Sequence, residues 1–141
     1  MNIVNIGTYP PKQCGIATFS ADLYHSLIRS HNQVKIIAVS DDSYIYSYPP
    51  EVIMNLKQNQ KSEYIRAANL INSTNADMVI IQHEYGIYGG NCGEYLLELI
   101  KYLKKPFVTV THTVLPHPSR KQRLILEPLC RKSSAIIPMS K

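Results

Sequence analysis

The sequence predicts an α/β fold in which helices cover both faces of an open, mostly parallel sheet. Short apolar runs bounded by turn residues recur along the 141 residues, and such runs are typical of buried strands. Segments with helical spacing separate most of these runs. Strands joined through crossover helices run parallel, and the crossovers are almost always right-handed. Together these observations favour a Rossmann-like sheet.

The predicted strands are six apolar runs. They span residues 3–6, 34–39, 52–54, 78–81, 107–111 and 135–139. Each is short and is bounded by polar or turn-forming residues, as the buried strands of parallel sheets are. The segment 41–51 contains two aspartates and two prolines, so we expect a loop there.

Four segments have helical spacing, and small, polar or glycine residues open each of them. They span residues 16–31, 61–74, 91–104 and 119–132. In two of them apolar side chains fall at i, i+3, i+4 and i+7, namely Tyr64, Ala67, Ala68 and Ile71, and then Leu96, Leu99, Ile100 and Leu103. Residues at this spacing share one helix face, so both faces should pack on the sheet.

Length and composition indicate one domain with a single core. The formal net charge of +5 is compatible with binding to phosphates or anionic head groups, but it does not identify a partner. Cys14, Cys92 and Cys130 are odd in number and lack a C-x-x-C pattern, which favours a reducing, cytoplasmic setting. A signal peptide and a membrane-spanning segment are both disfavoured, whereas peripheral membrane contact stays open.

Open parallel sheets bind ligands at the carboxyl ends of their strands, which draws attention to three predicted loops. The first spans residues 7–16 and places Gly15 at the mouth of a helix. Free backbone N–H groups there can face a phosphate or carboxylate, and Lys12 can add a positive charge. The glycine patterns of dinucleotide-binding folds and P-loops are absent, and a plain strand-to-helix turn is the alternative.

The loops after the fourth and fifth predicted strands carry histidines. His83 and Glu84 lie in one loop, and His112 and His117 lie in the other. An imidazole beside a carboxylate can orient sugar hydroxyls or move protons, although a structural histidine and a solvated glutamate are the alternative. His83 and His112 should converge on one cleft. The fixed spacing of a metal-binding motif is absent, so we expect no metal.

Three segments of the chain resemble glycosyltransferase family 4. They are residues 8–19 (TYPPKQCGIATF), 82–86 (QHEYG) and 108–114 (VTVTHTV), and their order and spacing agree with the family. The first segment is the most specific of the three. The resemblance covers essentially the whole chain.

The resemblance implies one half of a GT-B fold, in which two Rossmann-like domains face each other across a cleft. Residues 1–141 then form the N-terminal, acceptor-side domain, and the donor-binding C-terminal domain is absent. Members of the family transfer a sugar from a nucleotide-sugar donor, retain its anomeric configuration and need no metal or other cofactor. Mannose and glucose are candidate sugars, and a glycan or a lipid-linked molecule is the expected acceptor.

By the same resemblance, Gly15 and Ile16 lie near the donor diphosphate and His112 lies near the transferred sugar. His83 and Glu84 line the acceptor side. The family's paired glutamates and its diphosphate-binding basic residues belong to the second domain, so we expect little or no turnover from this chain alone. An exposed inter-domain face should favour self-association.

Two other functions stay open. The chain is alternatively a stand-alone module that binds a sugar or a phosphate, or an enzyme similar to the nucleotide-sugar epimerases that uses His83, Glu84 and His112 as acid and base. Nucleic-acid binding is disfavoured, because the basic residues lack adjacent stacking aromatics or a groove-entering motif.

Overall fold

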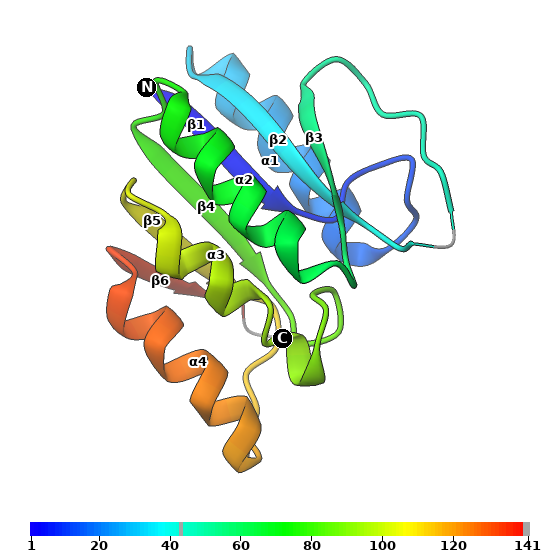
Figure 1. Cartoon of the computed structure of the whole chain (residues 1–141). Coiled ribbons are helices and arrows are strands. Elements are labelled where there is room, and N and C mark those ends of the chain that lie inside the picture. Colours follow the sequence, from blue (N-terminus) through cyan, green and yellow to red (C-terminus); the bar gives the residue numbers. More distant parts are fainter. Residues whose placement is uncertain (43, 140–141) are drawn as a thin grey trace.

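A computed structural model describes residues 1–42 and 44–139; Ser43, within the predicted loop 41–51, and Ser140 and Lys141 lie outside the described residues. Six parallel strands form one sheet in the order β3-β2-β1-β4-β5-β6 (Figure 1). The strands are β1 (Asn2–Gly7), β2 (Gln33–Ser40), β3 (Val52–Lys57), β4 (Met78–His83), β5 (Phe107–Thr111) and β6 (Ala135–Pro138). The predicted open, parallel sheet is confirmed.

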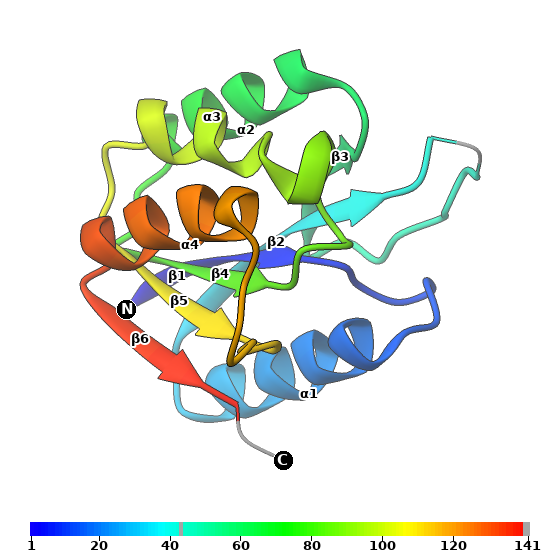
Figure 2. The ribbon, with the colours of Figure 1, turned by 90° about the horizontal axis from the view of Figure 1, so that it is seen from below.

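The helices are α1 (Gly15–Arg29), α2 (Lys61–Ser73), α3 (Leu96–Tyr102) and α4 (Arg120–Lys132). Helix α1 covers one face of the sheet, and α2, α3 and α4 cover the other (Figure 2). The predicted covering of both faces is therefore confirmed. Within the described part of the chain, the helices are all too short or too polar to cross a membrane.

Two apolar clusters hold the layers together. The smaller cluster joins Ile3, Val34 and Ile36 to α1. The larger one joins the alternate residues of the same strands to the predicted helix faces, and it includes Val4, Ile6, Ile37, Val39, Val79, Ile81, Tyr64, Ala67, Ala68, Ile71, Leu96, Leu99, Ile100 and Leu129. Burial of each large apolar side chain contributes about 1.5–3 kcal/mol, so these contacts are the main source of stability.

The predicted helix 91–104 is interrupted. A 3₁₀ turn, η1 (Asn91–Gly93), comes first, and α3 follows it as a separate, shorter helix. Gly90, Cys92 and Gly93 all have positive φ angles, which a right-handed helix does not accept. The prediction of one continuous helix was therefore wrong, because three of the four residues 90–93 have backbone angles outside the right-handed helical region.

The strand order reverses beside β1. This strand pairs in parallel with β2 on one side and with β4 on the other. The chain builds one half of the sheet through β2 and β3, and then crosses back to build the other half through β4, β5 and β6. In open α/β sheets, the carboxyl ends of the strands at such a switch point frame the usual ligand crevice. In this protein those ends are Gly7 and His83.

Candidate functional site

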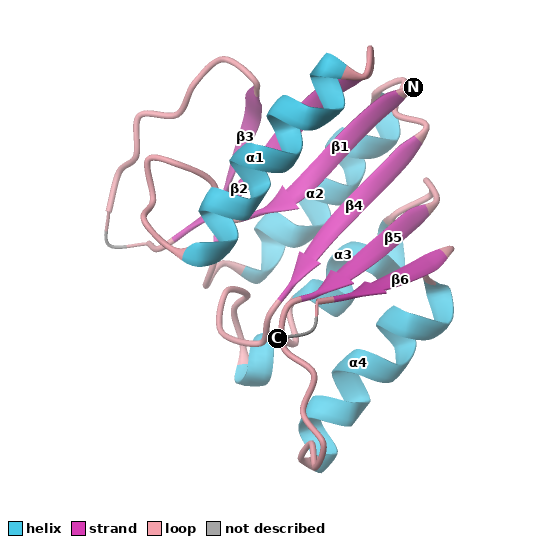
Figure 3. Ribbon diagram, turned by 180° about the vertical axis from the view of Figure 1, so that it is seen from behind, coloured by secondary structure: helices cyan, strands magenta, loops and turns pink. Residues whose placement is uncertain are grey.

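Three loops leave the same edge of the sheet. The arrowheads of the strands all point to this edge, where the loops after β1, β4 and β5 begin (Figure 3). His83 at the end of β4 pairs in register with Thr111 at the end of β5. The backbone N–H of His112 extends the pairing by donating to the carbonyl oxygen of His83 at 2.9 Å. The pairing of β4 with β5 therefore brings the backbones of the two candidate histidines, His83 and His112, together.

His112 is half-buried, and one of its ring nitrogens is bonded inside the protein. Its Nε2 lies 2.7 Å from Oε1 of Gln82. The ring of Phe19, from α1, packs edge-on against the imidazole with the centroids 5.0 Å apart. Burial lowers the pKa of His112, and the carboxylate of Glu84 acts in the opposite direction. The ring is therefore mostly neutral at neutral pH, with one donor and one acceptor nitrogen.

A buried pair of amides lies behind His112. Nε2 of Gln82 donates to Oδ1 of Asn5 at 2.8 Å, and neither side chain is more than 2% exposed. The two amides come from β4 and β1, which are the strands at the switch point. The sequence patterns assigned no role to either residue. The signal was Asn5 itself, a polar residue inside an apolar strand, because a buried amide needs a partner.

The side chain of His83 points to the opposite face of the sheet from His112. Consecutive residues of a strand alternate between faces, and Gln82 occupies the face that carries His112. The ring of His83 is 1% exposed and packs against Tyr85 and Tyr88, with centroids 4.9 and 6.4 Å away. The two histidines thus share an edge of the sheet, but their rings point to opposite faces. The prediction that they converge on one cleft was wrong.

Burial keeps His83 neutral. It lowers the pKa of this histidine to about 4, and the neighbouring His112 adds a smaller effect in the same direction. Nδ1 of His83 is buried and has no hydrogen-bond partner in the described part of the chain. The ring can influence a ligand only through the residues that cover it.

Glu84 is half-buried and shapes the turn after β4. Its Oε2 accepts a hydrogen bond from the backbone N–H of Gly86 at 2.8 Å. The same loop is anchored to its surroundings, because Gly86 accepts from Nε2 of Gln58 at 3.1 Å and the N–H of Gly89 donates to the hydroxyl of Tyr64 at 2.9 Å. A Cβ on Gly89 would lie 2.0 Å from the carbonyl oxygen of Gln58, so this approach requires glycine.

The loop after β1 opens α1 with an accessible glycine. Cys14 caps the helix, since its Sγ accepts from the backbone N–H of Ala17 at 3.4 Å. Gly15 is the first helical residue, and a Cβ on it would meet no atom within 4 Å. The half-buried Ile16 follows. The first turn of α1 therefore begins beside open space, where its N–H groups and dipole favour an anion.

Lys12, from the same loop, is already paired. Its Nζ lies 2.5 Å from Oδ1 of Asp41, and Oδ2 of Asp41 accepts from the hydroxyl of Tyr46 at 3.1 Å. The hydrogen bond from Lys12 is the main cause of a lowered pKa at Asp41. A second contact joins the same two loops, since the hydroxyl of Tyr9 donates to Glu51 at 2.8 Å. Lys12 thus brings less free positive charge to the helix N-terminus than its sequence position suggests.

Among the residues that the structure describes, no group of three or more His, Cys, Asp or Glu side chains is placed to hold a metal ion. His117, from the loop after β5, is exposed. The candidate chemistry of this edge therefore rests on the imidazole of His112, the carboxylate of Glu84 and the open helix N-terminus.

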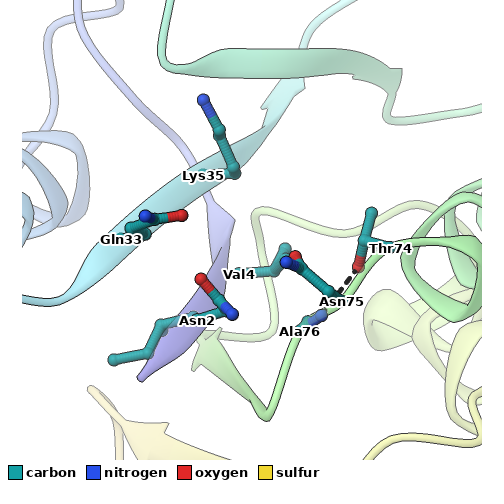
Figure 4. Close-up of a pocket in the computed structure, with 8 residues that line it drawn as sticks. Asn2, Val4, Gln33, Lys35, Thr74, Asn75 and Ala76 are labelled. Atoms are coloured by element: carbon teal, nitrogen blue, oxygen red, sulfur yellow. Dashed lines mark hydrogen bonds between the residues drawn. The ribbon is translucent and has the colours of Figure 1, made fainter.

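Two pockets lie away from these loops. The pocket in Figure 4 is at the opposite, amino-terminal edge of the sheet, where Asn2, Lys35 and Thr74 are among the residues that line it. The other lies on the outer side of α2, α3 and α4 and is lined in part by Lys61 and Glu98, whose charged atoms are 3.7 Å apart. Neither pocket contains a predicted site residue.

The comparisons with known proteins concern the fold. No protein family model matches the chain, and no curated protein matches it at a significant level. The chain is similar to the solved structure of an alpha-glucosyltransferase in complex with UDP and a 13-mer DNA containing a central A:G mismatch, with a TM-score of 0.68 and 20% identity. That match covers 98% of this chain and 37% of the glucosyltransferase.

A second solved structure is more distant. It is the N-terminal domain of a response regulator/sensory box/GGDEF 3-domain protein from Carboxydothermus hydrogenoformans, with a TM-score of 0.51 and 12% identity over 100% of this chain and 83% of that one. Taken with the strand order, the likeness to the glucosyltransferase shows that the chain has the fold of one Rossmann-like half of a GT-B glycosyltransferase.

Proposed function

We propose that this chain is the acceptor-side domain of a retaining glycosyltransferase similar to family 4. It moves a sugar from a nucleotide-sugar donor to a hydroxyl of a glycan or a lipid-linked acceptor. One observation carries the proposal. Phe19 of α1 packs against His112, with their ring centroids 5.0 Å apart, and so joins the open helix N-terminus and a half-buried imidazole into one surface.

The helix N-terminus suits the diphosphate of a donor. The backbone at Gly15 and Ile16 lies in the first turn of a 15-residue helix, and the space beside Gly15 is open. N–H groups without intrahelical partners and the positive end of the helix dipole stabilise negative charge there. Lys12 adds its charge when a ligand draws it away from Asp41.

The imidazole and the carboxylate suit the sugar side of the reaction. His112 contacts the transferred sugar, and Glu84 lines the acceptor side from a turn that hydrogen bonds hold in place. His83 supports this edge from inside the fold and does not itself touch substrate. Sugar transfer needs an acceptor hydroxyl held in line and charge stabilisation at the leaving diphosphate, which are tasks of positioning and preorganised electrostatics.

A second domain supplies the other wall of the cleft. The chain spans 37% of the length of the glucosyltransferase that it resembles. Half of a cleft desolvates and orients its ligands only in part, so we expect the 141-residue chain to bind nucleoside diphosphates weakly and to show no measurable transfer.

Isothermal titration calorimetry with UDP and GDP tests the nucleotide part. Replacement of Gly15 by Ala should lower the affinity, because a methyl group then occupies the space in which the diphosphate approaches the helix. The His112→Ala variant should lose affinity for UDP-glucose or GDP-mannose more than for the nucleotide alone. The exposed His117 provides the matched control, since His117→Ala removes an imidazole away from the surface.

Transfer is measured by adding a purified donor-binding domain of a family 4 transferase and following release of UDP or GDP. Sugar transfer by the mixture, lost in His112→Ala, supports the proposal. Rapid transfer by the chain alone refutes the assignment as half of a site. Absence of nucleotide binding in both settings refutes the glycosyltransferase function, whereas tight binding without transfer favours the stand-alone binding module.

A further inference from the structure

Gln82 bonds to two groups through the two different ends of its amide. Its Nε2 donates to Oδ1 of Asn5 at 2.8 Å, and its Oε1 is therefore the end that lies 2.7 Å from Nε2 of His112. An amide oxygen only accepts hydrogen bonds. With the amide of Gln82 in this orientation, the short contact with His112 requires a proton on Nε2 of the imidazole.

We propose that Gln82 is a positioning residue that sets the tautomer of His112, with the proton on Nε2 and a lone pair on Nδ1. Nδ1 of His112 makes no hydrogen bond within the described part of the chain, and the histidine is only half-buried. A neutral His112 offers an acceptor at this nitrogen, which selects a ligand group that donates, such as a hydroxyl, and disfavours an anionic oxygen.

The side chain of Gln82 is closely packed, and Nδ2 of its partner Asn5 is buried without a hydrogen-bond partner in the described residues. The side chain is fully buried, and its partner Asn5 is 2% exposed. A Cβ on Gly7 would lie 2.9 Å from Cβ of Gln82, so the side chain of Gln82 lies in close contact with β1 at Gly7. Phe19 packs edge-on against His112 and restrains the ring without forming a polar bond to it.

Nuclear magnetic resonance tests the tautomer directly, without any ligand. The chain is labelled with ¹⁵N-histidine, and two-bond ¹H–¹⁵N correlation spectra are recorded near pH 8, where the lowered pKa of His112 leaves the ring neutral. We expect a protonated Nε2 and an unprotonated Nδ1. A protonated Nδ1, or an equal mixture of the two tautomers, would overturn the proposal.

Two variants of Gln82 separate tautomer control from simple packing. Gln82→Met removes the acceptor, so the resonances of His112 should shift to those of a tautomer mixture. Gln82→Glu keeps an acceptor and adds negative charge, so Nε2 stays protonated and the pKa of His112 rises by about one unit or more. Phe19→Leu is the matched control, because it alters packing on the same ring and should leave the tautomer unchanged.

Two results with these variants contradict the proposal. One is a folded Gln82→Glu variant in which the pKa of His112 is unchanged. The other is a shift of the tautomer in Phe19→Leu as large as that in Gln82→Met. Asn5→Leu gives a further test from a residue that does not contact the histidine, since it frees the amide of Gln82 to rotate and should also produce a tautomer mixture.

The identity of the ligand rests on the proposed function, whereas the tautomer does not. If Nε2 carries the proton but neither UDP nor GDP binds even with a second domain present, the glycosyltransferase function fails and the role of Gln82 stands. If nucleotides bind but Nδ1 carries the proton, the role of Gln82 fails and the glycosyltransferase function stands.

Discussion

Nζ of Lys12 lies 2.5 Å from Oδ1 of Asp41, so the lysine of the loop before α1 is paired with a carboxylate of the loop after β2. Asp41 also accepts from Tyr46, which holds the carboxylate in place. A phosphate at the N-terminus of α1 must therefore compete with Asp41 for the ammonium group. This competition makes the affinity of the site for anions sensitive to a residue that does not touch the ligand.

Replacement of Asp41 by Asn should raise the affinity for UDP by about two- to fivefold, which is the range that one partly exposed ion pair supplies. The reason is that Lys12 no longer has to leave a carboxylate. Isothermal titration calorimetry at low salt measures the effect. Asp42→Asn removes the same charge from the neighbouring position, whose Oδ1 accepts instead from the backbone of Asn59 at 3.5 Å. Equal gains in the two variants would mean that net charge, and not the pair, sets the affinity.

The stability of the protein should fall between about pH 6.5 and pH 4 because of His83. Burial lowers the pKa of this histidine from 6.5 to about 4 in the folded state. Between these values the unfolded chain binds more protons than the folded one, so the free energy of unfolding decreases as the pH falls. The full effect of the shift is roughly 3 kcal/mol.

Urea unfolding of His83→Leu at several pH values measures this contribution. The variant should lose the part of the pH dependence that His83 causes, while the part from His112, whose pKa burial also lowers, remains. His117→Leu, at an exposed position, controls for the loss of an imidazole as such. A pH dependence identical in wild type and His83→Leu would show that folding does not lower the pKa of His83.

The sequence predicted the layers of the fold well, because the apolar periodicity that it displays is the same periodicity that the core requires. Tyr64, Ala67, Ala68 and Ile71 are all fully buried on α2, as their spacing indicated. The prediction of a helix over 91–104 was wrong at its start, since the residue type at Cys92 does not indicate its left-handed φ angle. Local sequence patterns therefore predict which face of a helix is buried more reliably than they predict a local reversal of the backbone.

The candidate site was predicted less completely than the fold, since its contacts join residues far apart in the chain. Gln82 and Asn5 are 77 positions apart, and neither forms a motif with the other. The orientation of His83 depends on where β4 ends: the predicted strand stopped at residue 81, whereas the observed one continues through His83. Two further strand residues decide that the ring points inward, away from the face of His112.

Two glycines should respond oppositely to the same substitution. Gly89→Ala should lower the free energy of unfolding by about 2–3 kcal/mol, because its Cβ would lie 2.0 Å from the backbone oxygen of Gln58. Gly15→Ala should change stability by no more than about 1 kcal/mol, and in the favourable direction, since it adds a helix-forming residue in open space. Thermal and urea unfolding of both variants measures the contrast. A strongly destabilised Gly15→Ala would mean that the space beside this helix start is filled in solution.

The edge strand β6 should promote self-association. All four of its residues are exposed, including Ile136 and Ile137 at 41% and 48%, and the side of β6 away from β5 has no partner strand in the described residues. An exposed apolar edge with unpaired backbone groups is a template for pairing with another chain. Sedimentation velocity over a range of concentrations should therefore show association in the wild type and a clear reduction in Ile137→Lys.

The matched control for β6 is Ile45→Lys. Ile45 is 93% exposed, but it lies in the loop after β2, away from this sheet edge. The same apolar-to-charged change at that position should leave association unaltered, because it touches no unpaired strand. Equal reductions in the two variants would assign the association to general hydrophobic exposure, and a wild type that stays monomeric at high concentration would show that β6 is protected in solution.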